Sequence, residues 1–380
     1  MPDVVVVGAG PVGTLLAGLL ARDGVDVQLL EKRATAGGGS RAIGIHAPVL
    51  AALEDSGLTE NLLARAARVP RGAARSRGRV LGVVRFDRLS SRFPFVATLP
   101  QAATEGVLAA IAPEPMRGVA VHALDPRGER IRVRAGAADR SIEIDAPIVV
   151  VASGSRAREL VYRPGVVPIR RYRDRYLMTD AAVGDRAGGD VAVVNLEASG
   201  VLESFPLPGG LRRFVAWDPS GADPDPRARS ARLREALRTR GEPDAADAVV
   251  EATGFGVRRF VAPRLRRGRL FVIGDAAHEV SPIGGQGLNL GMLDAATLAP
   301  LIVAWTRTGE APQAELRRWE RRRVASARTA ARMASVNTAL GRALPRPADD
   351  VRRAAVRAML ARPAGPVFAR AYTMGFDRDA

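Results

Sequence analysis

Cysteine is absent from the 380-residue chain, and histidine occurs only three times. Without thiols there are no disulfides, thiolate nucleophiles or cysteine-ligated metal sites. His46, His122 and His278 stand far apart in the sequence and make a histidine-based metal centre a poor expectation, so no metal is predicted. Redox chemistry in such a chain would have to come from a bound organic cofactor.

Lysine is nearly absent as well. Lys32 is the only one, so arginine supplies almost all of the positive charge behind the formal net charge of +17. The arginines are scattered, and no helix-turn-helix or RNA-recognition aromatic pattern accompanies them, which argues against nucleic-acid binding. A solvated basic surface is the simplest interpretation. Attraction of anionic cofactors or of an anionic membrane surface is the alternative.

Long apolar runs are missing too. We find no uninterrupted stretch of ~18 apolar residues that could span a bilayer. The apolar N-terminal segment is broken by Gly8, Gly10, Pro11 and Gly13, unlike a secretory signal. We therefore expect a cytoplasmic protein with at most peripheral membrane contact. With 47% apolar and 26% charged residues, the composition is typical of a globular protein of two or three domains.

A glycine motif opens the chain. Val4 to Val7 predicts a buried parallel strand, Thr14 to Arg22 an apolar helix, and Val25 to Leu30 a second strand that ends at Glu31. In the turn Gly8 to Gly13, the glycines permit a tight turn, close backbone approach to a pyrophosphate and close helix–strand packing. An acid at the end of the second strand suits a ribose 2′-hydroxyl. The motif indicates a dinucleotide site, with FAD and NAD both open.

A second glycine-rich segment follows the predicted strand Leu270 to Ile273. It reads Gly274-Asp275-Ala276-Ala277-His278, and then Ser281-Pro282-Ile283-Gly284-Gly285-Gln286-Gly287-Leu288-Asn289 at the start of an apolar helix. A carboxylate at the end of a strand is well placed for a chain of sugar-like hydroxyls. The glycines would let backbone N–H groups and a helix N-terminus face an anion, such as the negative charge of a reduced flavin.

With these residues the chain resembles the class A flavoprotein monooxygenases, which have the para-hydroxybenzoate hydroxylase fold. The resemblance covers roughly positions 1–160 and 260–305, and also includes Arg41 and Leu99-Pro100-Gln101 with Glu105. It implies an α/β fold, with a Rossmann-like FAD-binding domain, an inserted β-rich substrate domain and C-terminal helices. The expected divisions are FAD binding in 1–70, 99–162 and 263–310, substrate-domain strands in 71–98, a β-rich substrate domain in 163–262, and C-terminal helices in 311–380.

The resemblance also assigns roles to residues. Glu31 would hold the adenosine ribose, Arg41 would lie near the pyrophosphate, Gln101 near the ribityl–isoalloxazine region, and Asp275 on a ribityl hydroxyl. Pro282, Gly284 and Gly285 are predicted as the catalytic segment facing the reactive part of the flavin. The full set of predicted cofactor-binding residues is Gly8, Gly10, Pro11, Val12, Gly13, Glu31, Lys32, Arg41, Gln101, Gly274, Asp275, Pro282, Gly285, Gly287, Leu288 and Asn289.

The chain departs from the family pattern at one point. The family usually carries an Asp-Gly pair, implicated in FAD and NAD(P)H contacts, where this chain has Ser153 and Gly154. FAD binding remains expected, but the choice of NADH or NADPH and the reduction rate are open.

The implied reaction uses NAD(P)H to reduce FAD, and O₂ to form a C4a-hydroperoxyflavin that oxygenates an aromatic, phenolic or quinone-like substrate, as in secondary metabolism. One alternative is a flavin-dependent reductase acting on an isoprenoid C=C bond. The other is a flavin-binding accessory protein with impaired catalysis. The substrate site is expected between the flavin and the β-rich layer, lined by residues from 80–98 and 175–217. The substrate, the oligomeric state and a general base are not assigned.

Four further features each have two interpretations. His278 is expected to make structural hydrogen bonds rather than to act in catalysis. Arg170 to Arg173 forms either a solvated basic strand or an anion site. Tyr172 and Tyr176 either bind a phenolic substrate or pack in strands. The arginine-rich helical segment Asp349 to Met374 either packs on the protein or touches a membrane surface.

Overall fold

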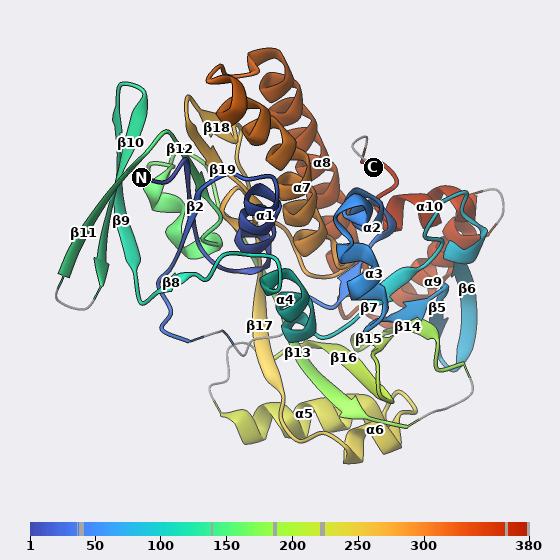
Figure 1. Ribbon diagram of the computed structural model, residues 1–380. Coiled ribbons are helices and arrows are strands. Elements are labelled where there is room, and N and C mark those ends of the chain that lie inside the picture. Colours follow the sequence, from blue (N-terminus) through green and yellow to red (C-terminus); the bar gives the residue numbers. More distant parts are fainter. Residues whose placement is uncertain are drawn as a thin grey trace.

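The computed structural model describes residues 1–35, 37, 42–137, 140–184, 188–220, 225–361 and 364–377. Arg41, a predicted cofactor-binding residue, lies outside the described residues. Two large sheets dominate the molecule, and long C-terminal helices run from one to the other (Figure 1). The predicted α/β class with a β-rich region and C-terminal helices is confirmed.

The first sheet has six strands in the order β18-β19-β12-β1-β2-β8, and all but β18 run parallel. Its central strands β1 and β12 are entirely apolar and buried, as expected for strands covered on both faces. The strands are β1 (Val4–Val7), β2 (Val27–Glu31), β8 (Met116–Arg117), β12 (Ile148–Val151), β18 (Arg266–Arg267) and β19 (Leu270–Val272).

Helices α1 (Pro11–Arg22) and α7 (Gln286–Thr308) pack against each other beside this sheet. Helix α1 begins at Pro11, three residues before the predicted start at Thr14, because the fixed φ of proline suits the first helical position. An antiparallel sheet of β9 (Ala120–Arg127), β10 (Arg130–Ala137) and β11 (Arg140–Ala146) contacts β2 and β12. Its apolar residues belong to the same core.

The second sheet has eight strands in the order β20-β17-β13-β16-β15-β14-β5-β6. Neighbours are antiparallel except β14 and β5, whose parallel pairing ties the N-terminal part of the chain to the middle part. These strands are β5 (Arg71–Ser76), β6 (Arg79–Arg85), β13 (Arg170–Ala182), β14 (Val191–Glu197), β15 (Gly200–Pro206), β16 (Leu211–Asp218), β17 (Thr253–Val261) and β20 (His278–Glu279).

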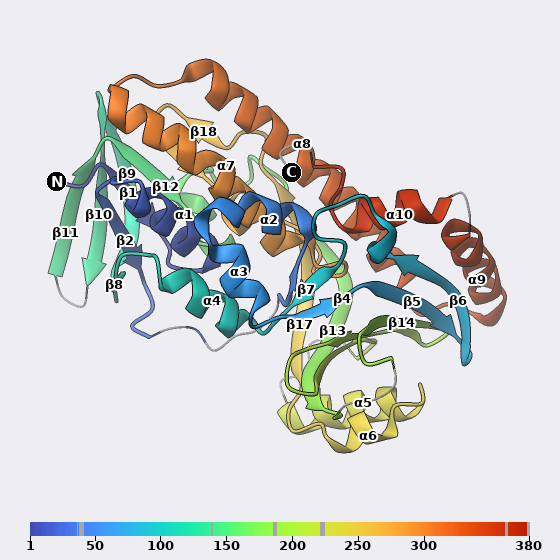
Figure 2. The same ribbon diagram turned by 45° about the vertical axis from the view of Figure 1, so that its right-hand side comes forward.

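Helices α5 (Pro226–Arg238) and α6 (Pro243–Asp247) lie on the outer side of the second sheet (Figures 1 and 2). Helix α5 starts four residues before the predicted Ser230, because Asp225 accepts a hydrogen bond from the Arg227 N–H at 2.9 Å and Pro226 opens the helix.

A further small sheet joins β3 (Gly44–Ile45), β7 (Val96–Thr98) and β4 (Ala67–Val69). The sequence places β7 with the substrate-domain strands of 71–98, but in the structure it pairs with β3 and β4. It still contacts the second sheet, because the Thr98 hydroxyl donates to the Pro206 carbonyl at 2.7 Å. The helices near these strands are α2 (Ala47–Ala52), α3 (Leu58–Leu63) and α4 (Gln101–Ala109), with short 3₁₀ turns η1 (Glu54–Ser56) and η2 (Phe86–Arg88).

The C-terminal helices are α8 (Gln313–Leu340), α9 (Arg346–Leu360) and α10 (Ala364–Tyr372). Helix α8 follows α7 and then reaches β17 in the second sheet, while α9 and α10 pack on β6 (Figure 2). Arg352 of α9 is buried and donates to the Leu340, Arg342 and Glu197 carbonyls at 2.7–2.9 Å. These contacts favour a packed amphipathic helix over the membrane-surface alternative.

Helix α7 bears on the expectation that the chain has no apolar stretch long enough to span a bilayer. By length and composition Gln286–Thr308 is one candidate membrane span among the described residues, although Asp294 interrupts it. Most of its central residues are buried against α1 and α8. Its position is that of a core helix.

Candidate functional site

The first glycine turn closes tightly onto strand β12. Gly8 has a φ of +108°, and a methyl group there would lie 2.7 Å from the Ala152 carbonyl oxygen. A methyl group on Gly13 would lie only 1.9 Å from the Gly8 carbonyl oxygen. At Gly10, in contrast, a methyl group would meet nothing within 4 Å. The turn therefore requires glycine at two positions for packing, and at Gly10 it presents backbone to open space.

Glu31 folds back onto this turn. Its carboxylate accepts hydrogen bonds from the Ala9 N–H at 2.9 Å and from the Arg33 N–H and Nε at 3.0 Å. Burial alone raises the pKa of Glu31, but the hydrogen bonds from Arg33 and Ala9 outweigh it and hold that pKa below its ordinary value. Glu31 is therefore a fixed anion at the edge of the turn. Lys32, also predicted here, is exposed.

The second glycine segment meets the first. Gly274, with a φ of +63°, packs on Val12, to whose side chain an added methyl group would approach within 3.3 Å. Gly291 of α7 packs on the same valine, and a methyl group there would come within 2.5 Å of it. Asp275 is exposed at the start of the 3₁₀ turn η4 (Gly274–Ala276), and its carbonyl accepts from Arg158 at 2.7 Å. The two motifs, remote in sequence, thus form one continuous surface.

Gly284 and Gly285 both adopt positive φ, +104° and +67°. They turn the chain from Pro282 into α7, whose first N–H groups have no acceptor within the helix. Asn289 holds this turn, because its amide donates to the Gly44 and Gly285 carbonyls at 2.9 Å and accepts from the His46 N–H at 2.8 Å. The Asn289 side chain therefore clamps the segment, which leaves backbone groups to face a ligand.

Of the buried polar groups near the motifs that have no hydrogen-bond partner among the described residues, two are not histidine or arginine nitrogens. One is the hydroxyl of Ser153, a residue whose backbone packs against Gly8. The other is the side-chain amide of Gln286 at the start of α7. Buried polar groups are normally paired. Together with the open backbone at Gly10, they fit a site for a phosphate- and amide-bearing cofactor such as FAD. Gln101 is engaged in this region with Glu105 at 2.8 Å and with the Ala42 N–H at 3.4 Å.

His278 belongs to a buried charge network. Its Nε2 lies 2.5 Å from Asp294, which also accepts from the Gly274 N–H at 3.0 Å and from Arg323 at 2.8 Å. Arg323 in turn donates to Asp377 at 2.7 Å, and the side chains of all four residues are buried. The network supports the glycine segment from behind, in agreement with the structural role expected for His278.

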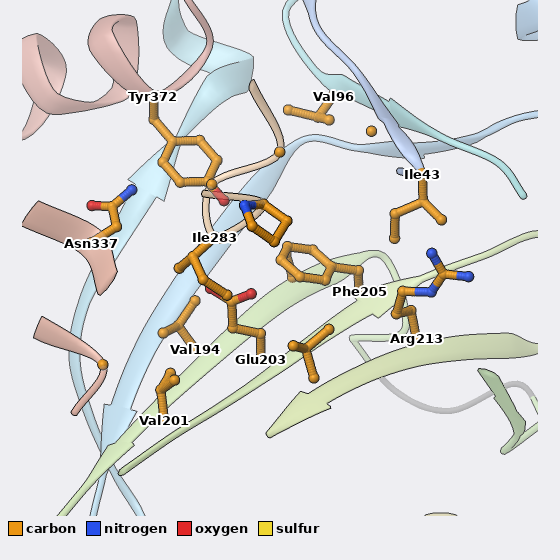
Figure 3. Close-up of a pocket in the computed structure, with 18 of the residues that line it drawn as sticks. Ile43, Val96, Val194, Val201, Glu203, Phe205, Arg213, Ile283, Asn337 and Tyr372 are labelled. Atoms are coloured by element: carbon orange, nitrogen blue, oxygen red, sulfur yellow. The ribbon is translucent and has the colours of Figure 1, made fainter. Parts of the chain in front are cut away.

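A cavity of about 290 Å³ opens between the second glycine segment, the eight-stranded sheet and the C-terminal helices (Figure 3). Of the predicted site residues, it is lined by Asp275, Pro282, Gly284, Gly285, Gly287 and Leu288. The predicted stretches 80–98 and 175–217 both contribute to it. The side chains from these stretches are Val84, Phe86, Val96, Thr98, Met178, Ala192, Val194, Leu196, Val201, Glu203, Phe205, Arg213 and Val215.

The ionisable groups of the cavity are of two kinds. Arg213 and Arg258 are already paired, Arg213 with both oxygens of Asp180 at 2.6 and 2.7 Å and Arg258 with Glu279 at 3.0 Å. His46 and Glu203 are buried, and desolvation favours their neutral forms. Burial lowers the pKa of His46 to about 4 and raises the pKa of Glu203 to about 7.

Sequence reasoning missed part of this cavity. The C-terminal helices close it with Asn337 and Leu340 of α8, Val356, Met359 and Leu360 of α9, and Phe368 and Tyr372 of α10. The tyrosines considered for substrate binding do not line it: Tyr172 bonds Ser335 at 2.7 Å, and Tyr176 stacks on Phe255. No local signal identified Tyr372 or Glu203, because each lies in an ordinary apolar pattern and becomes a cavity residue only through tertiary packing.

Comparison with known proteins agrees with this arrangement. A family model described as an FAD binding domain matches residues 1–334. The chain is 34% identical over 312 residues to 6-methylpretetramide 4-monooxygenase of Streptomyces rimosus, covering 78% of this chain and 55% of that protein. It is 31% identical over 349 residues to a 12-dehydrotetracycline 5-monooxygenase/anhydrotetracycline 6-monooxygenase of S. rimosus, covering 84% and 66%. The chain thus spans little more than half the length of the first of these relatives.

Solved structures share the fold. The p-nitrophenol 4-monooxygenase PnpA of Pseudomonas putida superimposes with a TM-score of 0.85 at 23% identity, covering 100% of this chain and 98% of that one. The anhydrotetracycline hydroxylase OxyS of S. rimosus superimposes with a TM-score of 0.77 at 26% identity, covering 99% and 76%.

Proposed function

The chain belongs to the FAD-binding-domain family of the class A flavoprotein monooxygenases, and on this premise we propose that it hydroxylates an aromatic, phenolic or quinone-like small molecule, using FAD, O₂ and NADH or NADPH. One observation carries the proposal. The two glycine segments meet at Val12, and the second of them also forms a wall of the apolar cavity. A cofactor lying along both segments would reach the cavity with its reactive end.

In this proposal the Gly8 to Gly13 turn and Glu31 hold the adenosine diphosphate part, with the free backbone at Gly10 facing the pyrophosphate. The Ser153 hydroxyl supplies a buried hydrogen-bonding group beside that turn. The α7 N-terminus, after Gly285, would hold the flavin end of FAD, and its unpaired N–H groups would favour negative charge there. When bound, FAD supplies the electron transfer and the oxygen-atom transfer to the substrate.

The other task of the chain is to position the substrate and to exclude water. The cavity wall is mostly aliphatic and aromatic, and α9 and α10 cover it from the side of β6. Such a surface favours flat, apolar molecules and keeps reactive species away from solvent. Pro282, Gly284 and Gly285 belong to the second glycine segment and also line the cavity, which suits their predicted catalytic position.

The relatives support an aromatic substrate. Their names describe hydroxylation of tetracycline precursors and of p-nitrophenol, and none describes reduction of an isoprenoid C=C bond. We therefore favour oxygenation over the reductase alternative, within secondary metabolism and in the cytoplasm. NADH or NADPH as the reductant, and with it a place in the NAD(P)H-dependent monooxygenase class, is part of the proposal. The presence of Ser153 instead of the usual acid makes the reduction rate a property to measure.

The proposal is tested with purified protein in two steps. We expect a flavin absorption spectrum, either as isolated or after addition of FAD. We then expect NAD(P)H oxidation that a polycyclic phenol or quinone accelerates, with one atom of ¹⁸O₂ recovered in the product. A protein that remains colourless in excess FAD would rule out the proposal. Flavin reduction with substrate turnover but no ¹⁸O in the product would instead support the reductase.

A further inference from the structure

Glu203 is the one carboxylate in the cavity wall that has no partner among the described residues. Asp275 and Glu279, the other two acids in the wall, each have partners. Glu203 lies in the middle of β15, where its backbone neighbours are Val194 of β14 and Val215 of β16. Its side chain is only 6% exposed and makes no hydrogen bond or ion pair within the described part of the chain. A buried acid without a partner costs stability, so its position needs an explanation.

Tyr372 provides a second polar group. Its ring is stacked between His46 at 6.3 Å and Phe86 at 5.8 Å, measured between ring centroids. Figure 3 shows its hydroxyl and the Glu203 carboxylate directed into the same cavity. Burial, followed by the nearby charge of Glu203, raises the pKa of Tyr372, so its hydroxyl stays protonated and can donate. One acceptor and one donor therefore face a mostly apolar space.

No cation that the described residues contribute to the wall is available for an anionic ligand. The guanidinium of Arg213 is paired with Asp180, and that of Arg258 with Glu279. His46 stays neutral, because burial lowers its pKa to about 4. An anion in the cavity would face Glu203 without compensation, and an unpaired buried charge is strongly disfavoured. The charges of the wall thus select against carboxylate-bearing substrates.

From this juxtaposition we infer that Glu203 and Tyr372 bind the hydroxyl group of a neutral hydroxyaromatic substrate, and that Glu203 is the catalytic base that accepts its proton. The inference rests on the proposed function and narrows its substrate class. Tyr372 donates to the substrate oxygen, and the Glu203 carboxylate accepts the substrate O–H. When that O–H bond breaks, the proton moves to Glu203 and its bonding electrons stay on the substrate oxygen, so the total charge is unchanged. The electron-rich ring is then more reactive toward electrophilic oxygen.

The ionisable groups near the Glu203 side chain keep their charge near pH 7, so the ionisation of Glu203 can be measured by itself. Tyr176 of β13 and Tyr372 of α10 lie close enough to experience its charge, and His46 stacks on Tyr372. Both tyrosines have raised pKa values and stay neutral near neutral pH, and His46 is neutral there as well. A change in ligand binding across pH 7 therefore reports the ionisation of Glu203, whose pKa is about 7.

The test is equilibrium dialysis of the full chain with FAD, but without reductant, against three naphthalene probes. These are 2-naphthol, 2-methoxynaphthalene and 2-naphthoate, each measured at about pH 6 and about pH 8. We expect 2-naphthol to bind about tenfold more tightly at the higher pH, the size of one charge-assisted hydrogen bond. Binding of 2-naphthoate should weaken over the same range, and 2-methoxynaphthalene should be insensitive.

The variant Glu203→Gln should abolish both pH effects and should bind 2-naphthoate more tightly at pH 8 than the wild type does. Tyr372→Phe keeps the stacked ring and should weaken 2-naphthol binding several-fold without removing its pH dependence. Glu235→Gln, an exposed acid on α5, serves as the matched control and should behave as the wild type. Equal pH profiles for the three probes, or an unchanged profile in Glu203→Gln, would overturn the inference.

Binding and turnover fail separately. If the wild type hydroxylates a substrate and Glu203→Gln has the same pH profile of kcat, the proposed function stands and the role of Glu203 is wrong. If 2-naphthol binds with the expected pH dependence but ¹⁸O₂ is never incorporated, the hydroxyl-binding pair stands. In that case the proposed function is wrong, and with it the role of Glu203 as a catalytic base.

Discussion

The cofactor side and the cavity side of the site are built by different means. The cofactor side uses backbone: positive φ angles at Gly8, Gly274, Gly284 and Gly285, close packing at Gly13, and the unpaired N–H groups of a helix N-terminus. The cavity side uses side chains from the eight-stranded sheet, the small β3-β7-β4 sheet and three C-terminal helices, most of them apolar. Backbone recognition imposes glycine at fixed spacings and can be seen in one sequence, whereas an apolar wall can be built by many combinations of residues.

The largest effect is expected where backbone meets backbone. Gly13→Ala would place a methyl group 1.9 Å from the Gly8 carbonyl oxygen and should reduce the free energy of unfolding by about 3 kcal/mol or more, with loss of FAD binding. Gly10→Ala is its matched control, because nothing lies within 4 Å of the added methyl group. It should fold normally but bind FAD at least about tenfold more weakly. Urea unfolding measures the stability of both variants, and flavin titration measures their FAD affinity. A normal FAD affinity in Gly10→Ala would contradict recognition of the cofactor by the backbone at Gly10.

Asp294→Asn tests the charge network that supports the cofactor side. Arg323 and the Gly274 N–H donate to different oxygens of the Asp294 carboxylate, and asparagine replaces one of these oxygens with an NH₂ group, so we expect a loss of about 3 kcal/mol. Although burial raises the pKa of Asp294, its contacts with His278 and Arg323 hold that pKa below the ordinary value.

The carboxylate of Asp294 therefore stabilises the fold above the ordinary carboxyl pKa, and this contribution disappears as the pH falls through its lowered pKa. The difference between the wild type and Asp294→Asn should shrink in strong acid. Asp244→Asn, an exposed acid on α6, should change stability by only a few tenths of a kcal/mol. A similar loss in both variants would contradict the network.

Glu203→Gln should increase the free energy of unfolding, because the buried Glu203 carboxylate, unpaired among the described residues, destabilises the folded protein. The pKa of Glu203 is raised from 4.5 to about 7, so the ionised form is disfavoured in the folded protein. Below about pH 4.5 Glu203 is protonated in both the folded and the unfolded protein, and the wild type loses no stability. As the pH rises through about 7, the free energy of unfolding of the wild type declines relative to that of Glu203→Gln. At pH 8 the variant should be about 2–3 kcal/mol more stable than the wild type, and equal to it near pH 4. Thermal unfolding at both pH values decides the sign.

Ser153→Ala gives the smallest expected effect and links the two sides. Its buried hydroxyl has no partner among the described residues, so the free protein should keep its stability or gain about 0.5 kcal/mol. If the hydroxyl bonds the cofactor, FAD affinity falls several-fold. An unchanged FAD titration curve would place Ser153 outside the cofactor site.

The cofactor side of the site could be predicted from the sequence better than the cavity side. Strands β1, β12 and β19 and both glycine segments were predicted from sequence, because buried parallel strands are uniformly apolar and the turns require glycine. Helix starts were displaced where proline and Asp225 set the boundary. The pairing of β7 with β3 and β4 depends on contacts distant in sequence and was not predicted. Glu203, Tyr372 and the closure of the cavity by α9 and α10 depend on such contacts as well.

The Arg323–Asp377 ion pair has a consequence for how this protein is made. Arg323 needs Asp377 to complete its pairing in the interior, and residue 377 is synthesised well after both glycine segments have left the ribosome. Until then a guanidinium lacks one of its two carboxylate partners behind Gly274, and the nascent chain cannot finish its core. Flavin uptake during translation should therefore await synthesis of the segment that carries Asp377.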